Sequence, residues 1–194
     1  MEAQLEAGLV ARAAKGETES FQTLFEEHHG AMFRFAYCLI NDVDAAEDIA
    51  QECFVQLMRR PAFDPERGSL RQYLYGITRN LIRQRQRLNH REVQWDVEMD
   101  DAPMAAVATD ADRTTSRELA AVVQAALSSL PPGQREAIVL AEFEELPLDE
   151  AAAVVGVDLG AFKSRLHRVR ESLRSRLAPY RTHVRMPLPK GTTL

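Results

Sequence analysis

The residues of this chain that are best suited to chemistry are basic, and many of them lie near the C-terminal end. The segment from Gly160 to Leu177, GAFKSRLHRVRESLRSRL, carries six arginine or lysine side chains among five large apolar ones. Cationic side chains neutralise phosphate groups, so such a segment suits a polyanion such as DNA. The alternative is a helix face that is merely solvated.

Other kinds of chemistry have little support. The five histidines form no set with metal-ligand spacing, and the sequence contains no nucleophile motif and no glycine-rich phosphate loop. The two cysteines, Cys38 and Cys53, are isolated from each other, which indicates packing in a reducing compartment rather than metal binding. We therefore expect no enzyme, no metal, no cofactor and no small-molecule substrate.

The basic segment must be positioned by helices. Its large apolar residues share one helix face, at spacings of four, three, four and four residues: Phe162, Leu166, Val169, Leu173 and Leu177. Just before it, PLDEAAAVVG predicts a short helix that ends at Gly156, and Asp158 is a candidate N-cap for the next helix. A short helix, a glycine turn and a basic helix predict a helix-turn-helix, whose second helix enters the major groove of DNA.

The formal net charge is -5, but the charges are unevenly distributed along the chain. Residues 1–57 are acidic, residues 59–91 are rich in arginine, and residues 92–112 hold seven acids and no basic residue. No stretch alternates as a strand does, so we predict an all-α protein made of two small helical domains. The expected organisation is a first domain over 1–90, a flexible acidic linker over 91–114, the helix-turn-helix domain over 115–180 and a flexible tail over 181–194. The sequence holds no apolar run of about 18 residues and no secretory signal, so we expect no direct membrane insertion.

The segment DAAEDIAQECFVQL, residues 44–57, predicts a helix with two different faces. The inner face is apolar and comprises Ala46, Ile49, Ala50, Cys53 and Leu57. The outward face carries Asp48, Gln51, Glu52 and Val55. An aliphatic residue among acids suits a docking surface for a basic partner helix. An ordinary acidic face with one stray valine explains the pattern about equally well.

The next helix, SLRQYLYGITRNLIRQRQR, combines apolar, aromatic and basic residues. Its expected core face comprises Leu70, Leu74, Ile77, Leu81 and Leu88. A second face carries Tyr73, Gly76, Asn80, Arg83 and Arg87. Aromatic and amide groups can stack on and hydrogen-bond to unpaired bases, while arginines hold the phosphates. The candidates for base contact are Phe63, Tyr73, Tyr75 and Asn80, with core packing as an equal alternative for Phe63 and for Tyr75.

These segments resemble a known family. LPPGQREAIVLAEFEELPLDEAAAVVGVDLGAFKSRLHRVRESL resembles the promoter-binding C-terminal domain of bacterial sigma factors, most specifically in KSRLHRVR. DAAEDIAQECFVQL resembles the sigma-factor helix that docks on the coiled coil of the polymerase β' subunit. Together the matches cover about 20–90 and 115–178. The chain therefore resembles the two-domain extracytoplasmic-function (ECF) group of the sigma-seventy family, with a region 2-like bundle and a region 4-like helix-turn-helix.

The resemblance implies a promoter-specificity subunit with no active site of its own. Its partners would be core RNA polymerase, through the β' coiled coil and the β subunit, promoter DNA in single- and double-stranded form, and an anti-sigma factor. The loop over 62–69 would form the pocket for a base flipped from the minus-ten element. The acidic linker would follow the RNA path of polymerase, with a simple solvated linker as the alternative. The implied location is the bacterial cytoplasm, with the anti-sigma factor as a potential tether to the membrane.

The resemblance also assigns residues to three surfaces. The core-polymerase surface comprises Asp48, Gln51, Glu52 and Val55. The minus-ten surface comprises Phe63, Arg71, Tyr73, Tyr75, Arg79, Asn80, Arg83 and Arg87. The minus-thirty-five surface comprises Lys163, Ser164, Arg165, His167, Arg168 and Arg170.

Two other classes of function remain open. A free-standing helix-turn-helix regulator would explain the C-terminal domain, but it would give no role to the outward face over 48–55 or to the aromatic stripe. A helical interaction protein that does not bind DNA, such as a sigma-like decoy, would bind partners without directing transcription.

Overall fold

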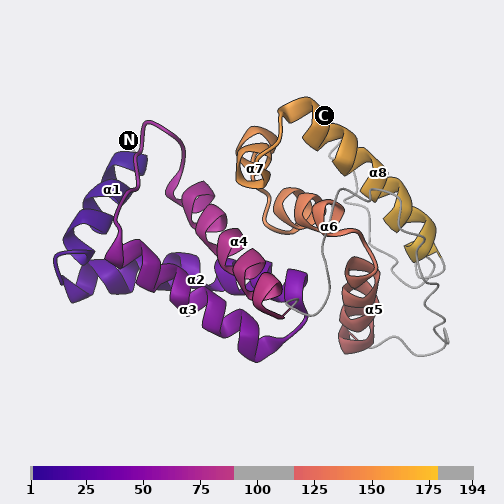
Figure 1. The fold of residues 1–194 in the computed structure, drawn as a ribbon, viewed down its shortest axis with the longest axis horizontal. Helices are drawn as coiled ribbons and strands as arrows, with labels where there is room; N and C mark the ends of the chain where they lie inside the picture. The colour runs from indigo at the N-terminus through magenta and orange to yellow at the C-terminus, as the bar shows by residue number, and fades with distance from the viewer. Residues whose placement is uncertain (1, 90–115, 179–194) are drawn as a thin grey trace, which may run out of the picture.

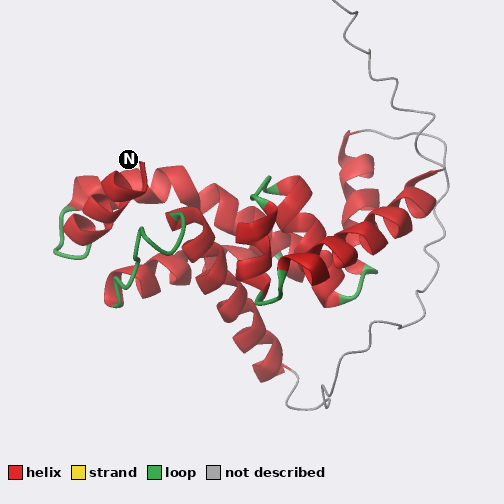
Figure 2. Ribbon diagram, turned by 90° about the horizontal axis from the view of Figure 1, so that it is seen from above, coloured by secondary structure: helices red, strands yellow, loops and turns green. Residues whose placement is uncertain are grey.

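A computed structural model describes residues 2–89 and 116–178 of the chain. The described residues form helices joined by short connections, and no strand occurs among them (Figure 2). The prediction of an all-α protein is confirmed. The predicted linker and tail lie outside the described residues, so the predicted domain boundaries stay predictions.

The first domain is a bundle of four helices: α1 (Glu2–Ala13), α2 (Thr18–Ile40), α3 (Val43–Arg59) and α4 (Leu70–Asn89). Local chemistry sets several of their ends. Asn41 takes the left-handed conformation, with φ 59°, and closes α2. The Asp42 side chain accepts a hydrogen bond from the backbone N–H of Ala45 and begins α3. The Ser69 hydroxyl does the same for Gln72 at the start of α4.

The predicted inner face of α3 is confirmed, since all five of its residues are buried. On α4 the prediction holds for Leu70, Leu74 and Leu81, which are buried, and Ile77 is half-buried. It is wrong for Leu88, which is 62% exposed. The helical period continues to Leu88, but the other described helices do not cover the last turn of α4.

The second domain comprises α5 (Ser116–Ser128), α6 (Pro132–Ile138), the π-helical turn η1 (Val139–Phe143), α7 (Leu148–Val155) and α8 (Leu159–Leu177). Gly156 ends α7 with φ 76°, a conformation that favours glycine, and Asp158 caps α8 by accepting from the N–H of Ala161. Phe162, Leu166 and Val169 of α8 are buried. The helix-turn-helix prediction is confirmed.

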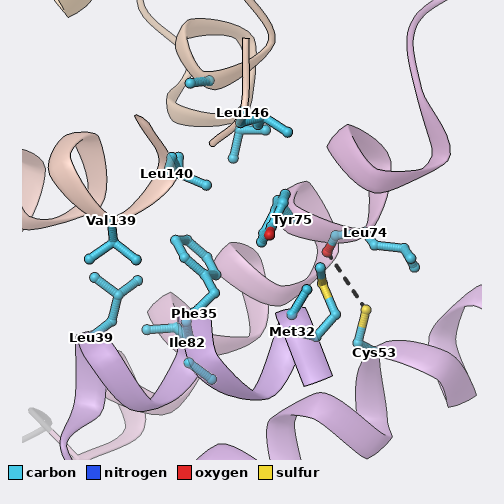
Figure 3. Packing of buried hydrophobic residues seen from close by; sticks show 14 of the residues in the cluster. Met32, Phe35, Leu39, Cys53, Leu74, Tyr75, Ile82, Val139, Leu140 and Leu146 are labelled. Atoms are coloured by element: carbon cyan, nitrogen blue, oxygen red, sulfur yellow. Dashed lines mark hydrogen bonds between the residues drawn. The ribbon is translucent and has the colours of Figure 1, made fainter. Parts of the chain in front are cut away.

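The two domains pack against each other, which the sequence did not indicate. In Figure 1, α4 lies beside α6 and α7 of the second domain. A single apolar cluster crosses the boundary between the domains. Figure 3 shows Leu39 of α2 pointing toward Val139, with Phe35 close to Leu140. Arg135 of α6 adds a hydrogen bond to the carbonyl of Leu39 at 2.9 Å. The described helices therefore form one closed arrangement.

Candidate polymerase and nucleic-acid interfaces

The outward face of α3 is accessible in this arrangement. Asp48 and Gln51 are exposed, Val55 is 38% exposed and Glu52 is half-buried. Asp48 lies 3.7 Å from the guanidinium of Arg85 on α4, a surface contact of small energetic weight. The face combines acidic side chains with an exposed valine at its C-terminal end, as the sequence predicted. Its role in docking stays a prediction.

A cavity of about 480 Å³ lies between the loop over 62–69 and one face of α4. Its lining includes Phe63, Tyr73 and Asn80, three of the four residues predicted to contact bases. The ring centroids of Phe63 and Tyr73 lie 5.9 Å apart, and the two rings form an aromatic wall. Ala153 and Val154 of α7 also line the cavity, so the second domain contributes part of the same space.

The loop depends on one glycine. Gly68 has φ 143°, and a Cβ atom at this position would lie 2.1 Å from the Gln72 side-chain oxygen. The backbone conformation therefore favours glycine here, while the Gln72 side chain could turn aside to make room for a Cβ atom. Gly76, on the α4 side of the cavity, has open space around it, since a Cβ there would meet nothing within 4 Å.

Tyr75, the fourth predicted base contact, is fully buried. Its ring packs edge-on against Phe35 at 5.2 Å, and its hydroxyl donates a hydrogen bond of 2.7 Å to the Glu144 carboxylate of the second domain. Burial raises the pKa of Tyr75 above its ordinary value, and the Glu144 charge acts in the same direction. In this arrangement Tyr75 cannot stack on a base, which favours its core-packing interpretation.

Arg79 is also withdrawn from solvent. Its Nε atom lies 3.0 Å from Glu136 of α6, and both side chains are 9% exposed. Burial lowers the pKa of Arg79, while the nearby charge of Glu136 opposes that shift. Arg83 lies 3.8 Å from the same carboxylate but remains exposed, as does Arg87.

Glu144 gathers a second group of donors from the first domain. Arg34 of α2 donates two hydrogen bonds to it, at 3.2 and 3.1 Å, and these raise the pKa of Arg34. Arg71 donates to the backbone carbonyl of Glu144 and lies 3.6 Å from its carboxylate. The Glu144 side chain is only 1% exposed. We name the whole set the interdomain clasp: Arg34, Arg71, Tyr75, Arg79, Glu136 and Glu144.

Sequence reasoning missed Arg34, Glu136 and Glu144. The segment AEFEEL offers three acids with no period that distinguishes them. The backbone distinguishes them instead, because the π-helical turn η1 and Glu145, with φ 50°, aim Glu142 toward α8 and Glu144 toward α4. Such local features are not readable from composition or periodicity.

The predicted minus-thirty-five surface on α8 lies open to solvent. Lys163, Ser164, His167, Arg168 and Arg170 are all exposed. Arg165 is half-buried, with its guanidinium against Gly133 of α6. Arg170 donates a hydrogen bond of 2.9 Å to Glu142. The structure thus brings these six side chains together at one helix. Their contacts with DNA stay predictions.

One group of side chains in the described residues could approach a cation: Glu6, Glu27 and His28, whose potential ligand atoms lie within 4.8 Å of one another. His28 is buried, and its Nε2 atom lies 3.7 Å from Glu6. Burial lowers the pKa of His28, with Glu27 opposing that shift and Arg71 acting in the same direction. We interpret the group as a polar packing contact between His28 and Glu6. No helix in the described ranges is long and apolar enough to cross a membrane.

Comparison with known proteins gives consistent matches. The chain matches Sigma-70 region 2 over residues 24–92 and Sigma-70, region 4 over residues 120–173. It is 36% identical to the ECF RNA polymerase sigma factor SigE of Mycolicibacterium smegmatis, over 83% of this chain and 63% of that protein. It is 30% identical to the ECF RNA polymerase sigma factor SigM of Mycobacterium tuberculosis, over 90% of this chain and 85% of that protein.

Two solved structures share the fold over most of this chain. The structure of CnrH in complex with the cytosolic domain of CnrY aligns with a TM-score of 0.67 at 27% identity, covering 89% of this chain and 97% of that one. The sigma factor RpoE of Bartonella quintana, solved with the anti-sigma factor NepR, aligns with a TM-score of 0.66 at 29% identity, covering 82% of this chain and 98% of that one.

Proposed function

Because this chain belongs to the ECF sigma factors of the sigma-70 family, we propose that it is a promoter-specificity subunit that binds core RNA polymerase and directs transcription initiation. The observation that carries this function is the pairing of two surfaces on one chain. A pocketed, aromatic and basic helix lies in the region 2 domain, and an exposed basic recognition helix lies in the region 4 domain.

The region 2 domain would serve both polymerase and the minus-ten element. The outward face of α3 would offer its acids, together with exposed Val55, to the basic β' coiled coil. The cavity beside Phe63, Tyr73 and Asn80 offers aromatic walls and an amide to an unpaired base. Extracting a base from the stack costs a few kcal/mol, and stacking contributes about 1–3 kcal/mol per base in return.

The region 4 domain would read the minus-thirty-five element as duplex. Asp158 and Gly156 set the angle at which α8 leaves the turn, and the first turns of α8 present Lys163, Ser164 and His167 to solvent. In a helix-turn-helix these turns reach the base edges of the major groove, where one bidentate pair contributes about 1–3 kcal/mol of discrimination. The more C-terminal arginines would hold phosphates.

Regulation by an anti-sigma factor has specific support. CnrH and the Bartonella RpoE, which share this fold at TM-scores of 0.67 and 0.66, were both solved with a protein partner bound. We infer a partner of the same kind for this chain, with a cytoplasmic site of action at the polymerase. The function requires no catalytic residue, metal or cofactor.

The decisive experiment is promoter opening with purified bacterial core polymerase. Genomic promoter fragments are treated with permanganate, which modifies unpaired thymines, in the presence of core, of this protein, or of both. Opening near a start site only when both are present supports the proposal. A Tyr73→Ala/Asn80→Ala variant should co-elute with core yet open at least tenfold less DNA, since each lost stacking or hydrogen-bond contact is worth about 1–3 kcal/mol.

Other outcomes point to the alternatives. Tight operator binding without polymerase, and no co-elution with core, would indicate a free-standing helix-turn-helix regulator. Co-elution with core but no opening at any fragment would indicate a sigma-like decoy.

A further inference from the structure

We propose that the interdomain clasp is an autoinhibitory lock, in which Glu136 and Glu144 of the region 4 domain occupy the DNA-binding side chains of α4 until the two domains separate. This inference rests on the proposed function, because it assumes that α4 serves the minus-ten element. It adds a state of the free protein in which that surface is closed by the chain itself, before any partner is present.

The first argument is competition for the same donors. Arg71 and Arg79 have N–H groups that would meet phosphates in a DNA complex. In the closed arrangement Arg79 donates to Glu136 at 3.0 Å, and Arg71 donates to the carbonyl of Glu144. The Tyr75 hydroxyl is taken by the Glu144 carboxylate. Two carboxylates thus stand where an anionic backbone would otherwise be held, and DNA and the region 4 domain cannot use these donors at once.

The second argument is burial. A carboxylate that is 1% exposed is costly unless it is paired, so the burial of Glu144 is sustained by Arg34, Arg71 and Tyr75 together. The apolar contact of Leu39 and Phe35 with Val139 and Leu140 adds to the same closed state (Figure 3). A chain that only tethered two domains would have no need of so specific a contact.

The third argument is position. Ala153 and Val154 of α7 lie at the base pocket, so closure narrows the space that an unpaired base would enter. Ser69, at the end of the pocket loop, donates to Glu150 at 2.7 Å and fixes that rim. The helices of residues 2–89 and 116–178 leave Asp48, Gln51 and Val55 of the outward face of α3 exposed, so core polymerase can bind a molecule whose α4 is still closed. Opening would follow polymerase binding.

The test measures binding of the free protein to a short fluorescein-labelled single-stranded oligonucleotide of mixed sequence, by fluorescence anisotropy at fixed salt. Stacking tolerates any sequence, so no promoter need be known. Glu136→Gln/Glu144→Gln should bind about tenfold more tightly than the unaltered protein, because a closed state that is dominant lowers apparent affinity by the open fraction. The control is Glu145→Gln/Asp149→Asn, which changes the charge equally at exposed positions and should have little effect.

Arg34→Gln separates release of the clasp from a simple charge effect. This substitution makes the protein more acidic, which by itself weakens DNA binding, yet it removes two hydrogen bonds from Glu144. The lock predicts tighter binding, by a smaller factor than for the double variant. Small-angle X-ray scattering should show a larger radius of gyration for both clasp variants than for the unaltered protein. The control should show no increase.

The outcomes decide the proposal. Binding by Glu136→Gln/Glu144→Gln equal to that of the control, or weaker binding by Arg34→Gln, would overturn the lock. If the double variant fails to fold, as judged by circular dichroism, the Arg34→Gln result alone decides. Failure of the unaltered protein to open promoters with core would count against the proposed function and not against the lock. A true lock also predicts that Glu136→Gln/Glu144→Gln still directs initiation with core.

Discussion

The helices α4 and α8 are both rich in arginine, yet their predicted DNA-binding side chains differ in exposure. On α8, five of the six predicted DNA-binding side chains are exposed, whereas on α4 Tyr75 and Arg79 are buried against acids of the other domain. A basic stripe on a helix therefore does not by itself mark a surface that is available to DNA. Whether it is open depends on where the acids of the other domain lie.

The largest difference in stability should be between alanine substitution of Arg79 on α4 and alanine substitution of Lys163 on α8. Arg79→Ala removes the closer cationic partner of buried Glu136 and leaves only Arg83, at 3.8 Å, which should cost up to about 3 kcal/mol of interdomain stability. Lys163→Ala removes an exposed side chain and should change stability by less than about 0.5 kcal/mol. Urea unfolding followed by circular dichroism, together with scattering at zero urea, measures both. Equal effects of the two substitutions would remove the contrast between α4 and α8.

Alanine substitutions of two glycines should change the stability by intermediate amounts and in opposite directions. Gly156→Ala forces alanine into φ 76° at the helix-turn-helix and should cost about 1 kcal/mol. Gly76→Ala on α4 meets open space and should gain up to about 1 kcal/mol of helix stability. The same Cβ narrows the base pocket, so promoter opening with core should fall although the protein is more stable. Thermal unfolding and permanganate reactivity, measured on both variants, test the pair.

Acid should weaken the first domain through His28. Burial lowers the pKa of His28, with Arg71 acting in the same direction and Glu27 opposing. Below about pH 6.5 the unfolded chain takes up a proton that the folded chain resists, so stability falls as the pH falls. His28→Asn should reduce the loss of stability between neutral and mildly acidic pH. His167→Asn, at an exposed position on α8, should leave that loss unchanged. Urea midpoints at several pH values provide the measurement.

The smallest effect should appear at the two thiols. Burial raises the pKa of Cys38 to about 11, and the Glu144 charge adds to that shift. Burial raises the pKa of Cys53 to about 11 as well, but Glu144 is not among its causes. Glu136→Gln/Glu144→Gln should therefore speed alkylation of Cys38 severalfold relative to Cys53, as read by peptide mass spectrometry after iodoacetamide. An unchanged ratio would mean that Cys38 does not sense the clasp.

Periodic features of the fold could be predicted from the sequence. The inner face of α3 followed from spacing alone, and so did the turn at Gly156 with its cap at Asp158, because these depend on contacts within a few residues. Leu88 continued the same period on α4 but lies exposed, since periodicity does not tell where the neighbouring helices stop.

The parts that depend on interdomain packing could not be predicted. Tyr75 and Asn80 lie on the same helix, yet one is buried and the other is exposed, because the second domain covers only one side of α4. Glu144 and Glu145 are adjacent acids with opposite fates, and a π-helical turn decides between them. The partners that bury Tyr75 and Arg79 lie 69 and 57 positions away in the chain.

In genetic terms, the buried carboxylate of Glu144 makes an unusual target. Most substitutions of a buried residue reduce activity, so a screen for lost function would discard them together with every misfolded variant. Substitution of Glu144 should instead appear in a screen for gained function, as an allele that is active under conditions that silence the normal gene. Such alleles should cluster at the three of the six clasp positions where no predicted DNA contact is lost, namely Arg34, Glu136 and Glu144, and they should be dominant over the unaltered copy.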